Sequence, residues 1–92
     1  MTEVIKTLAT QIGETPVVEL PTVSPEGAAK IYLKLESLNP SGSLKDRVML
    51  NLIEIAEEDG AIGPGSTLVD ACDQHAGISL AMLAASKGYR SL

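Results

Sequence analysis

A lysine at the start of a predicted helix is the first residue that could do chemistry. Lys45 follows residues 39–42, Asn-Pro-Ser-Gly, which predict a turn, and lies near the N-terminus of the helix after it. A cation there opposes the helix dipole at a cost of about 0.3–1 kcal/mol. The position therefore favours the neutral amine, which is the form that makes a Schiff base with a carbonyl. An exposed lysine whose charge Asp46 offsets is the alternative that this segment leaves open.

A thiol and an imidazole three residues apart form a second candidate. Cys72 and His75 are the only cysteine and histidine, and they could make a nucleophile pair or half of a metal site. Structural zinc needs four ligands, so carboxylates would have to complete the shell. The charge of Asp73 opposes the thiolate that catalysis needs, although a helix start favours it. The plainer interpretation is a small buried thiol, Asp73 as a helix N-cap and a solvated His75, with no metal site.

Hydrophobic periodicity and turn residues divide the chain into short elements. Residues 30–36 alternate apolar and polar side chains, which predicts a strand with one solvent-facing side. Ser43 stands three residues before Asp46, close to a capping box, and predicts the start of a helix that ends near Asp59. The predicted buried stripe of this helix consists of Val48, Leu52, Ile55 and Ala56. The other predicted elements are a short helix at 3–11, a strand at 17–20, a loop at 22–29, a buried strand at 67–71, a helix at 76–87 and a strand at 90–92.

The order of these elements predicts the fold class. Strand, helix, strand, helix, strand implies right-handed crossovers and a parallel sheet, so we expect an α/β fold with a βαβαβ arrangement. A parallel sheet normally has helices on both faces, and two helices are too few for that. Residues 1–92 are therefore predicted to form one truncated domain. Its open sheet edge and apolar face favour a homo-oligomer or association with another chain.

Composition excludes several classes of partner. The net charge is −5, and no cluster of Lys and Arg is present, so neither nucleic acid nor an anionic membrane is expected to bind. A single cysteine excludes an internal disulfide, and no leader or long apolar run is visible. We therefore predict a cytoplasmic protein. Without Phe or Trp, its core must come from aliphatic side chains.

Four segments carry a family resemblance. Residues 12–20, Ile-Gly-Glu-Thr-Pro-Val-Val-Glu-Leu, and 35–47, Leu-Glu-Ser-Leu-Asn-Pro-Ser-Gly-Ser-Leu-Lys-Asp-Arg, resemble the cysteine synthase and cystathionine β-synthase family. Residues 63–69, Gly-Pro-Gly-Ser-Thr-Leu-Val, and 77–81, Gly-Ile-Ser-Leu-Ala, continue the match in register. The resemblance implies the N-terminal part of a two-domain, fold-type-II pyridoxal-phosphate enzyme.

The resemblance also implies a reaction and a set of site residues. The family replaces the β-substituent of an activated serine, typically O-acetylserine with sulfide to give cysteine, and the lysine matching Lys45 attaches pyridoxal phosphate. The loop matching residues 72–76 reads Thr-Ser-Gly-Asn-Thr in the family, where it binds the substrate carboxylate and its Asn contacts the cofactor. By position, Lys45 and His75 are therefore the cofactor-binding candidates. The substrate-binding candidates are Cys72, Asp73, Gln74 and Ala76.

This loop departs from the family pattern. Asp73 puts a negative charge where a substrate carboxylate should dock, and Gln74 lacks the backbone freedom of glycine. Glu14 stands where relatives carry Asn. The glycine-rich loop that binds the cofactor phosphate in relatives would lie beyond Leu92. We therefore expect a truncated or inactive cysteine synthase-like form that binds pyridoxal phosphate weakly or not at all. The alternative is a noncatalytic interaction module that pairs with a full-length relative or another partner.

Overall fold

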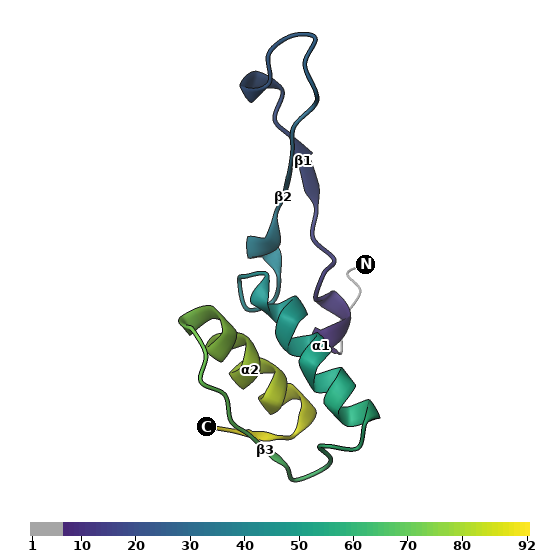
Figure 1. Ribbon diagram of the computed structural model, residues 1–92, viewed down its shortest axis with the longest axis vertical. Helices are drawn as coiled ribbons and strands as arrows, with labels where there is room; N and C mark the ends of the chain where they lie inside the picture. Colours follow the sequence, from purple (N-terminus) through teal and green to yellow (C-terminus); the bar gives the residue numbers. More distant parts are fainter. Residues whose placement is uncertain (1–6) are drawn as a thin grey trace, which may run out of the picture.

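Two helices packed side by side form the body of the molecule. The computed structural model describes residues 7–92. Helix α1 (Lys45–Glu58) and helix α2 (Gln74–Lys87) begin at the same end of the body, as Figure 1 shows. Between them in sequence, β3 (Thr67–Leu68) pairs in parallel with β4 (Arg90–Ser91). The predicted α/β class and parallel β3–α2–β4 unit are confirmed, but the strand predicted as buried at 67–71 is wrong in its burial, because Thr67 is exposed and Val69 is 71% exposed.

A β-hairpin projects from this body as a long arm (Figure 1). Strand β1 (Val17–Glu19) pairs antiparallel with β2 (Tyr32–Lys34). The prediction that the strand at 30–36 joins a continuous parallel sheet is therefore wrong, because its hydrogen bonds go to β1. All three residues of β2 are exposed, so the predicted single solvent-facing side is also wrong. Because the arm stands away from the helices, no core covers either of its faces.

The remaining short elements follow the turn residues of the sequence. A 3-10 helix covers Leu8–Gln11, inside the predicted helix at 3–11, whose first residues lie outside the described part. Two further 3-10 turns, Pro21–Val23 and Glu36–Leu38, flank the hairpin strands. Gly88 has a φ of 82° directly after α2, the left-handed conformation that ends a helix and favours glycine. None of the helices in the described part has the length and apolar character of a membrane span.

The buried face of α1 lies one residue further along than the sequence predicts. Met49 and Ile53 pack against α2, where the buried apolar residues are Ala76, Leu80, Leu83 and Ala84. In contrast, Val48, Leu52 and Ile55 are 40%, 54% and 47% exposed, and Ala56 is half-buried. One residue along a helix rotates the face by about 100°, so both stripes have helical spacing. The predicted stripe is wrong because contacts with α2, rather than periodicity, select the buried face.

Polar contacts join the two helices near both ends. Near the C-terminal ends, the Glu57 carboxylate accepts hydrogen bonds from Lys87 Nζ at 3.1 Å and from Tyr89 Oη at 2.6 Å. At the N-terminal end, the hydroxyl of Ser79 donates to the Asp46 carboxylate at 2.5 Å. The apolar contacts between Met49, Ile53 and α2 lie between these two links. The relative position of the helices is thus fixed by side chains far apart in sequence.

The hairpin arm is anchored to α1 by an arginine and a glutamate. Arg47 donates from Nε to Glu36 Oε1 at 2.5 Å and from its Nη2 to the carbonyl oxygen of Gly13 at 3.0 Å. Thr15 Oγ1 donates to Glu36 Oε2 at 2.5 Å, and the buried Asn39 accepts from the Gly13 N–H at 2.9 Å. The hydrogen bond from Arg47 and then that from Thr15 lower the pKa of Glu36 to about 2. The ionised carboxylate thus holds the base of the arm.

We predict that Glu36→Gln destabilises the chain in a pH-dependent way. A carboxyl whose pKa is lower in the folded state stabilises that state above its ordinary pKa of 4.5, and this stabilisation is lost as the pH falls towards 2. The difference in melting temperature between wild type and Glu36→Gln should therefore be constant above pH 4.5 and shrink below it. Circular dichroism melts from pH 7 to pH 2 measure it. In an Arg47→Ala background most of the difference should vanish, and an equal difference at all pH values would contradict the assignment.

Candidate functional site

The first residue of α1 meets the residue that caps α2. Lys45 Nζ lies 3.5 Å from Oδ2 of Asp73, and the two side chains are 36% and 58% exposed. The other oxygen of Asp73, Oδ1, accepts the backbone N–H of Ala76 at 2.8 Å. The predicted N-cap role of Asp73 is confirmed. Because the amine is partly exposed, a small molecule can reach it.

Local charges hold the Asp73 carboxylate in its ionised form. The N–H of Ala76 lowers the pKa of Asp73 most, and the charges of Lys45 and His75 lower it further. The positive ends of α1 and α2 both lie beside this pair. A single carboxylate thus faces a lysine and two helix N-termini, and it occupies a position where a ligand anion could otherwise bind.

The charge of Lys45 is offset by Asp73 and not by Asp46. Asp46 is fully buried, so the alternative in which it offsets an exposed lysine at the surface is wrong. The predicted capping box is wrong as well. Ser43 Oγ accepts the Lys45 N–H at 3.2 Å, while the Asp46 side chain turns inward and makes no cap. The physical reason is that Asp46 finds three donors in the interior.

These donors come from two segments. Asp46 Oδ2 accepts the N–H of Ser41 at 2.8 Å, and its Oδ1 accepts the hydroxyls of Ser41 and Ser79. The two serine hydroxyls also lie 3.0 Å apart. This network links the turn before Lys45 to α2. Ser41 and Ser79 were missed by reasoning from the sequence. The sequence did contain a signal for Ser79. This residue lies among the apolar residues of the predicted helix, on the helix face that must pack against the rest of the chain.

The other predicted site residues are distributed over the first turn of α2 and the segment before it. Cys72 is exposed, so the expectation of a buried thiol is wrong, whereas His75 is exposed as predicted. Gln74 is exposed too, but Ala76 is buried in the core, and only its N–H takes part in the Asp73 cap. Within residues 7–92, no group of three or more His, Cys, Asp or Glu side chains is arranged to hold a metal ion.

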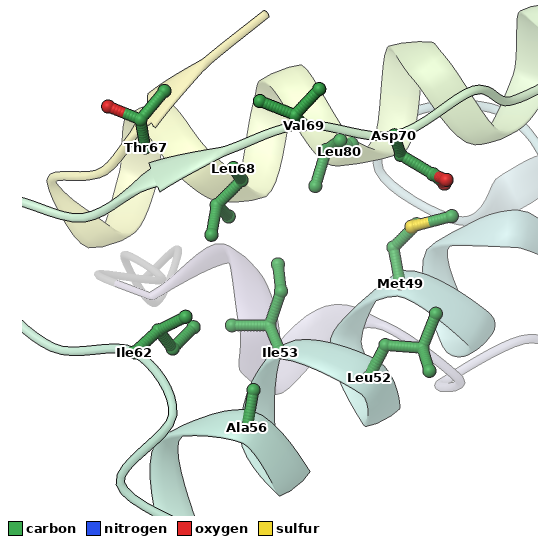
Figure 2. Close-up of a pocket in the computed structure, with 10 residues that line it drawn as sticks. All are labelled: Met49, Leu52, Ile53, Ala56, Ile62, Thr67, Leu68, Val69, Asp70 and Leu80. Carbon is green, nitrogen blue, oxygen red and sulfur yellow. The ribbon is translucent and has the colours of Figure 1, made fainter.

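A separate cavity lies between α1 and β3. It has a volume of about 350 Å³, and Figure 2 shows Ile53 of α1 facing Leu68 of β3 across it. Its lining is almost wholly apolar, with the carboxylate of Asp70 at one end. Neither Lys45 nor residues 72–76 contribute to its lining in the described structure. The cavity is therefore distinct from the site at the start of the helices.

Comparison with known proteins identifies the family. Residues 8–92 match the family model described as pyridoxal-phosphate dependent enzyme. The chain belongs to this family. It is 45% identical to the probable cysteine synthase of Bacillus subtilis (strain 168) over 92 residues, which are 100% of this chain and 30% of that protein. It is 48% identical to cysteine synthase B of Escherichia coli (strain K12) over 86 residues, 94% of this chain and 28% of that protein.

Solved structures agree with this assignment. The crystal structure of O-ureido-L-serine synthase matches with a TM-score of 0.87 and 42% identity, over 97% of this chain and 28% of that chain. The predicted resemblance to the N-terminal part of fold-type-II pyridoxal-phosphate enzymes is confirmed. The chain spans about 30% of the length of the relatives that it matches.

The geometry fits the aldehyde end of pyridoxal phosphate. Lys45 offers a primary amine that is partly exposed at the start of α1. The exposed imidazole of His75 lies in the first turn of α2, at the same end of the body. Lys45 and His75 are therefore the residues that would hold this end of the cofactor.

We predict that the two roles of Asp73 can be separated by mutation. Asp73→Asn keeps a side-chain oxygen that can accept the Ala76 N–H and removes only the charge beside Lys45, whereas Asp73→Ala removes both. Asp73→Ala should therefore have the lower melting temperature at pH 7, with Asp73→Asn between it and wild type. Thermal unfolding followed by circular dichroism tests this. Equal melting temperatures for the two variants would show that the cap contributes nothing.

Proposed function

We propose that this chain acts as a cysteine synthase-like, pyridoxal-phosphate-dependent protein in which Lys45 attaches the cofactor. The observation that carries the proposal is the 3.5 Å contact between Lys45 Nζ and Asp73, because it brings the amine to the loop at the start of α2. Pyridoxal phosphate, when bound, supplies an electron sink for bond cleavage at the α-carbon of an amino acid. The family reaction proposed here is replacement of the acetoxy group of O-acetylserine by sulfide, which gives cysteine.

Each residue of the site has a proposed task. Lys45 holds the cofactor and must first lose the extra proton of its ammonium group. The positive ends of α1 and α2 lie beside the amine, and the Asp73 carboxylate forms an ion pair with it. His75 donates or accepts one hydrogen bond at the cofactor. The proposed substrate-binding residues at and before the start of α2 are Cys72, Asp73, Gln74 and Ala76.

Asp73 leads us to propose a low or absent cysteine synthase activity for this chain. Its carboxylate is ionised and already accepts the Ala76 N–H. An amino-acid carboxylate brought to the same helix end would meet a like charge at short range, which costs affinity. Cysteine formation from O-acetylserine and sulfide, followed with the full chain and pyridoxal phosphate, measures this directly. A turnover comparable to that of a cysteine synthase would contradict it.

We also propose a cytoplasmic location, which the exposed free thiol of Cys72 suits.

The attachment of the cofactor can be tested without any turnover. We predict that pyridoxal phosphate added to the full chain, followed by borohydride reduction and peptide mapping, labels Lys45 roughly tenfold more than other lysines, because Lys45 lies at two helix N-termini. The exposed Lys34 in the hairpin and Lys87 at the end of α2 are internal references. Lys45→Ala should abolish the excess label and leave the references unchanged. Equal labelling of all three lysines would exclude a selective site.

A second proposal is a noncatalytic interaction module, which the exposed apolar face of α1 favours. Val48, Leu52 and Ile55 form a stripe of helical spacing that is 40–54% exposed, and the neighbouring Val69 is 71% exposed. An apolar stripe of this kind is usually covered in a folded protein. The stripe thus gives the chain a surface for a second copy or for a relative of the same family.

We predict that the chain self-associates through this stripe. Light scattering on a size-exclusion column should give a mass above that of a 9.6 kDa monomer at about 100 µM, a concentration at which weak apolar interfaces populate. Leu52→Glu should shift the mass towards the monomer. The matched control is Val23→Glu, because Val23 is 58% exposed but lies in the 3-10 turn beyond β1. A monomer in the wild type, or an equal effect of both variants, would count against the module.

A further inference from the structure

Asp46 is the most deeply buried charged group in the described part of the chain. Its side chain is 0% exposed, and its three hydrogen bonds come from neutral groups: the N–H of Ser41 and the hydroxyls of Ser41 and Ser79. Burying a carboxylate without a partner cation is expensive unless its oxygens are well hydrogen-bonded. The N-terminal position in α1 offsets part of that cost through the helix dipole. A residue with this cost requires a reason beyond the stability of the core.

The contacts of Asp46 define what it holds in place. Ser41 lies in the turn that leads into α1, and Ser79 lies in α2, 33 residues beyond Asp46. The carboxylate therefore ties three segments together: the turn, the first turn of α1 and the body of α2. Lys45 directly precedes Asp46 at the start of α1. Its amine extends to Asp73 at the start of the same helix α2 that Ser79 anchors.

We propose that Asp46 is a positioning residue for Lys45, acting through Ser41 and Ser79. The network fixes the start of α1 against α2, and so it fixes the separation between the Lys45 amine and residues 72–76. The value of this position for chemistry rests on the proposed function, in which Lys45 attaches the cofactor. The geometric part does not, because the Lys45–Asp73 ion pair exists without any ligand.

A zero-length cross-linker reads this geometry directly. Carbodiimide converts a carboxylate and an amine in contact into an amide with loss of water, so the 3.5 Å pair should give a Lys45–Asp73 link that peptide mapping detects. Asp46→Ala removes all three acceptor contacts and should lower the yield of this link about tenfold, because small displacements of paired groups cost large factors in rate. Asp46→Asn should restore most of the yield. Its carbonyl oxygen can accept the Ser41 N–H, and its amide can donate to both hydroxyls.

A core variant separates positioning from general loss of stability. Ile53→Ala removes a buried side chain on the same face of α1 but leaves the network untouched. Measured where circular dichroism shows both variants folded, Ile53→Ala should keep a yield close to wild type. Equal yields in Asp46→Ala and Ile53→Ala would overturn the proposal. If Asp46→Ala does not fold, Ser79→Ala replaces it, and an unchanged yield in Ser79→Ala would have the same meaning.

The same variants, probed with pyridoxal phosphate and borohydride, keep the two proposals apart. If Asp46 positions a cofactor-binding lysine, Asp46→Ala should lose the excess label at Lys45 relative to Lys34 in parallel with the cross-link, and Asp46→Asn should regain it. A cross-link that depends on Asp46 in a chain without selective labelling would support the positioning role while rejecting the proposed function. A cross-link that survives Asp46→Ala would reject the positioning role whatever the labelling shows.

Discussion

The Asp46 carboxylate carries a negative charge into the protein interior, and the arrangement of the helix pair follows from how that charge is satisfied. Water cannot solvate it there, so Ser41 and Ser79 must supply the donors. Those donors lie on opposite sides of the start of α1, one before it in sequence and one in α2. Satisfying one group thus fixes which face of α1 turns towards α2, and the apolar contacts of Met49 and Ile53 follow from that orientation.

A second constraint comes from chain topology. Helices α1 and α2 run in the same direction, so their N-termini lie at one end of the body. Two positive helix ends together attract negative charge. In this chain Asp73 supplies the negative charge from within the fold.

Helix α1 has two apolar faces, one buried and one exposed. One face packs on α2, while the stripe of Val48, Leu52 and Ile55 stays exposed. Of this stripe, Leu52 also lines the cavity beside β3. The hairpin arm adds exposed apolar residues of its own, among them Val17, Tyr32 and Leu33. Its attachment depends on the Arg47–Glu36 pair at the base of the arm, where Thr15, just before β1, also donates to Glu36. The stripe begins at Val48, one helical turn after Lys45, so the proposed association surface borders the proposed cofactor site.

The sequence by itself determined the features that depend on neighbouring residues: the C-terminal ends of both helices, the Asp73 cap, the parallel β3–α2–β4 unit and the family motif around Lys45. These follow from local backbone preferences, capping and short spacings, which a single stretch of chain contains. Only the tertiary structure decided that β2 pairs with β1, that Asp46 turns inward and that Met49 and Ile53 are buried. Periodicity cannot choose between two apolar stripes of equal spacing on one helix. The choice depends on donors and packing partners about 30 residues away, Ser79 above all, whose positions exist only once the chain has folded.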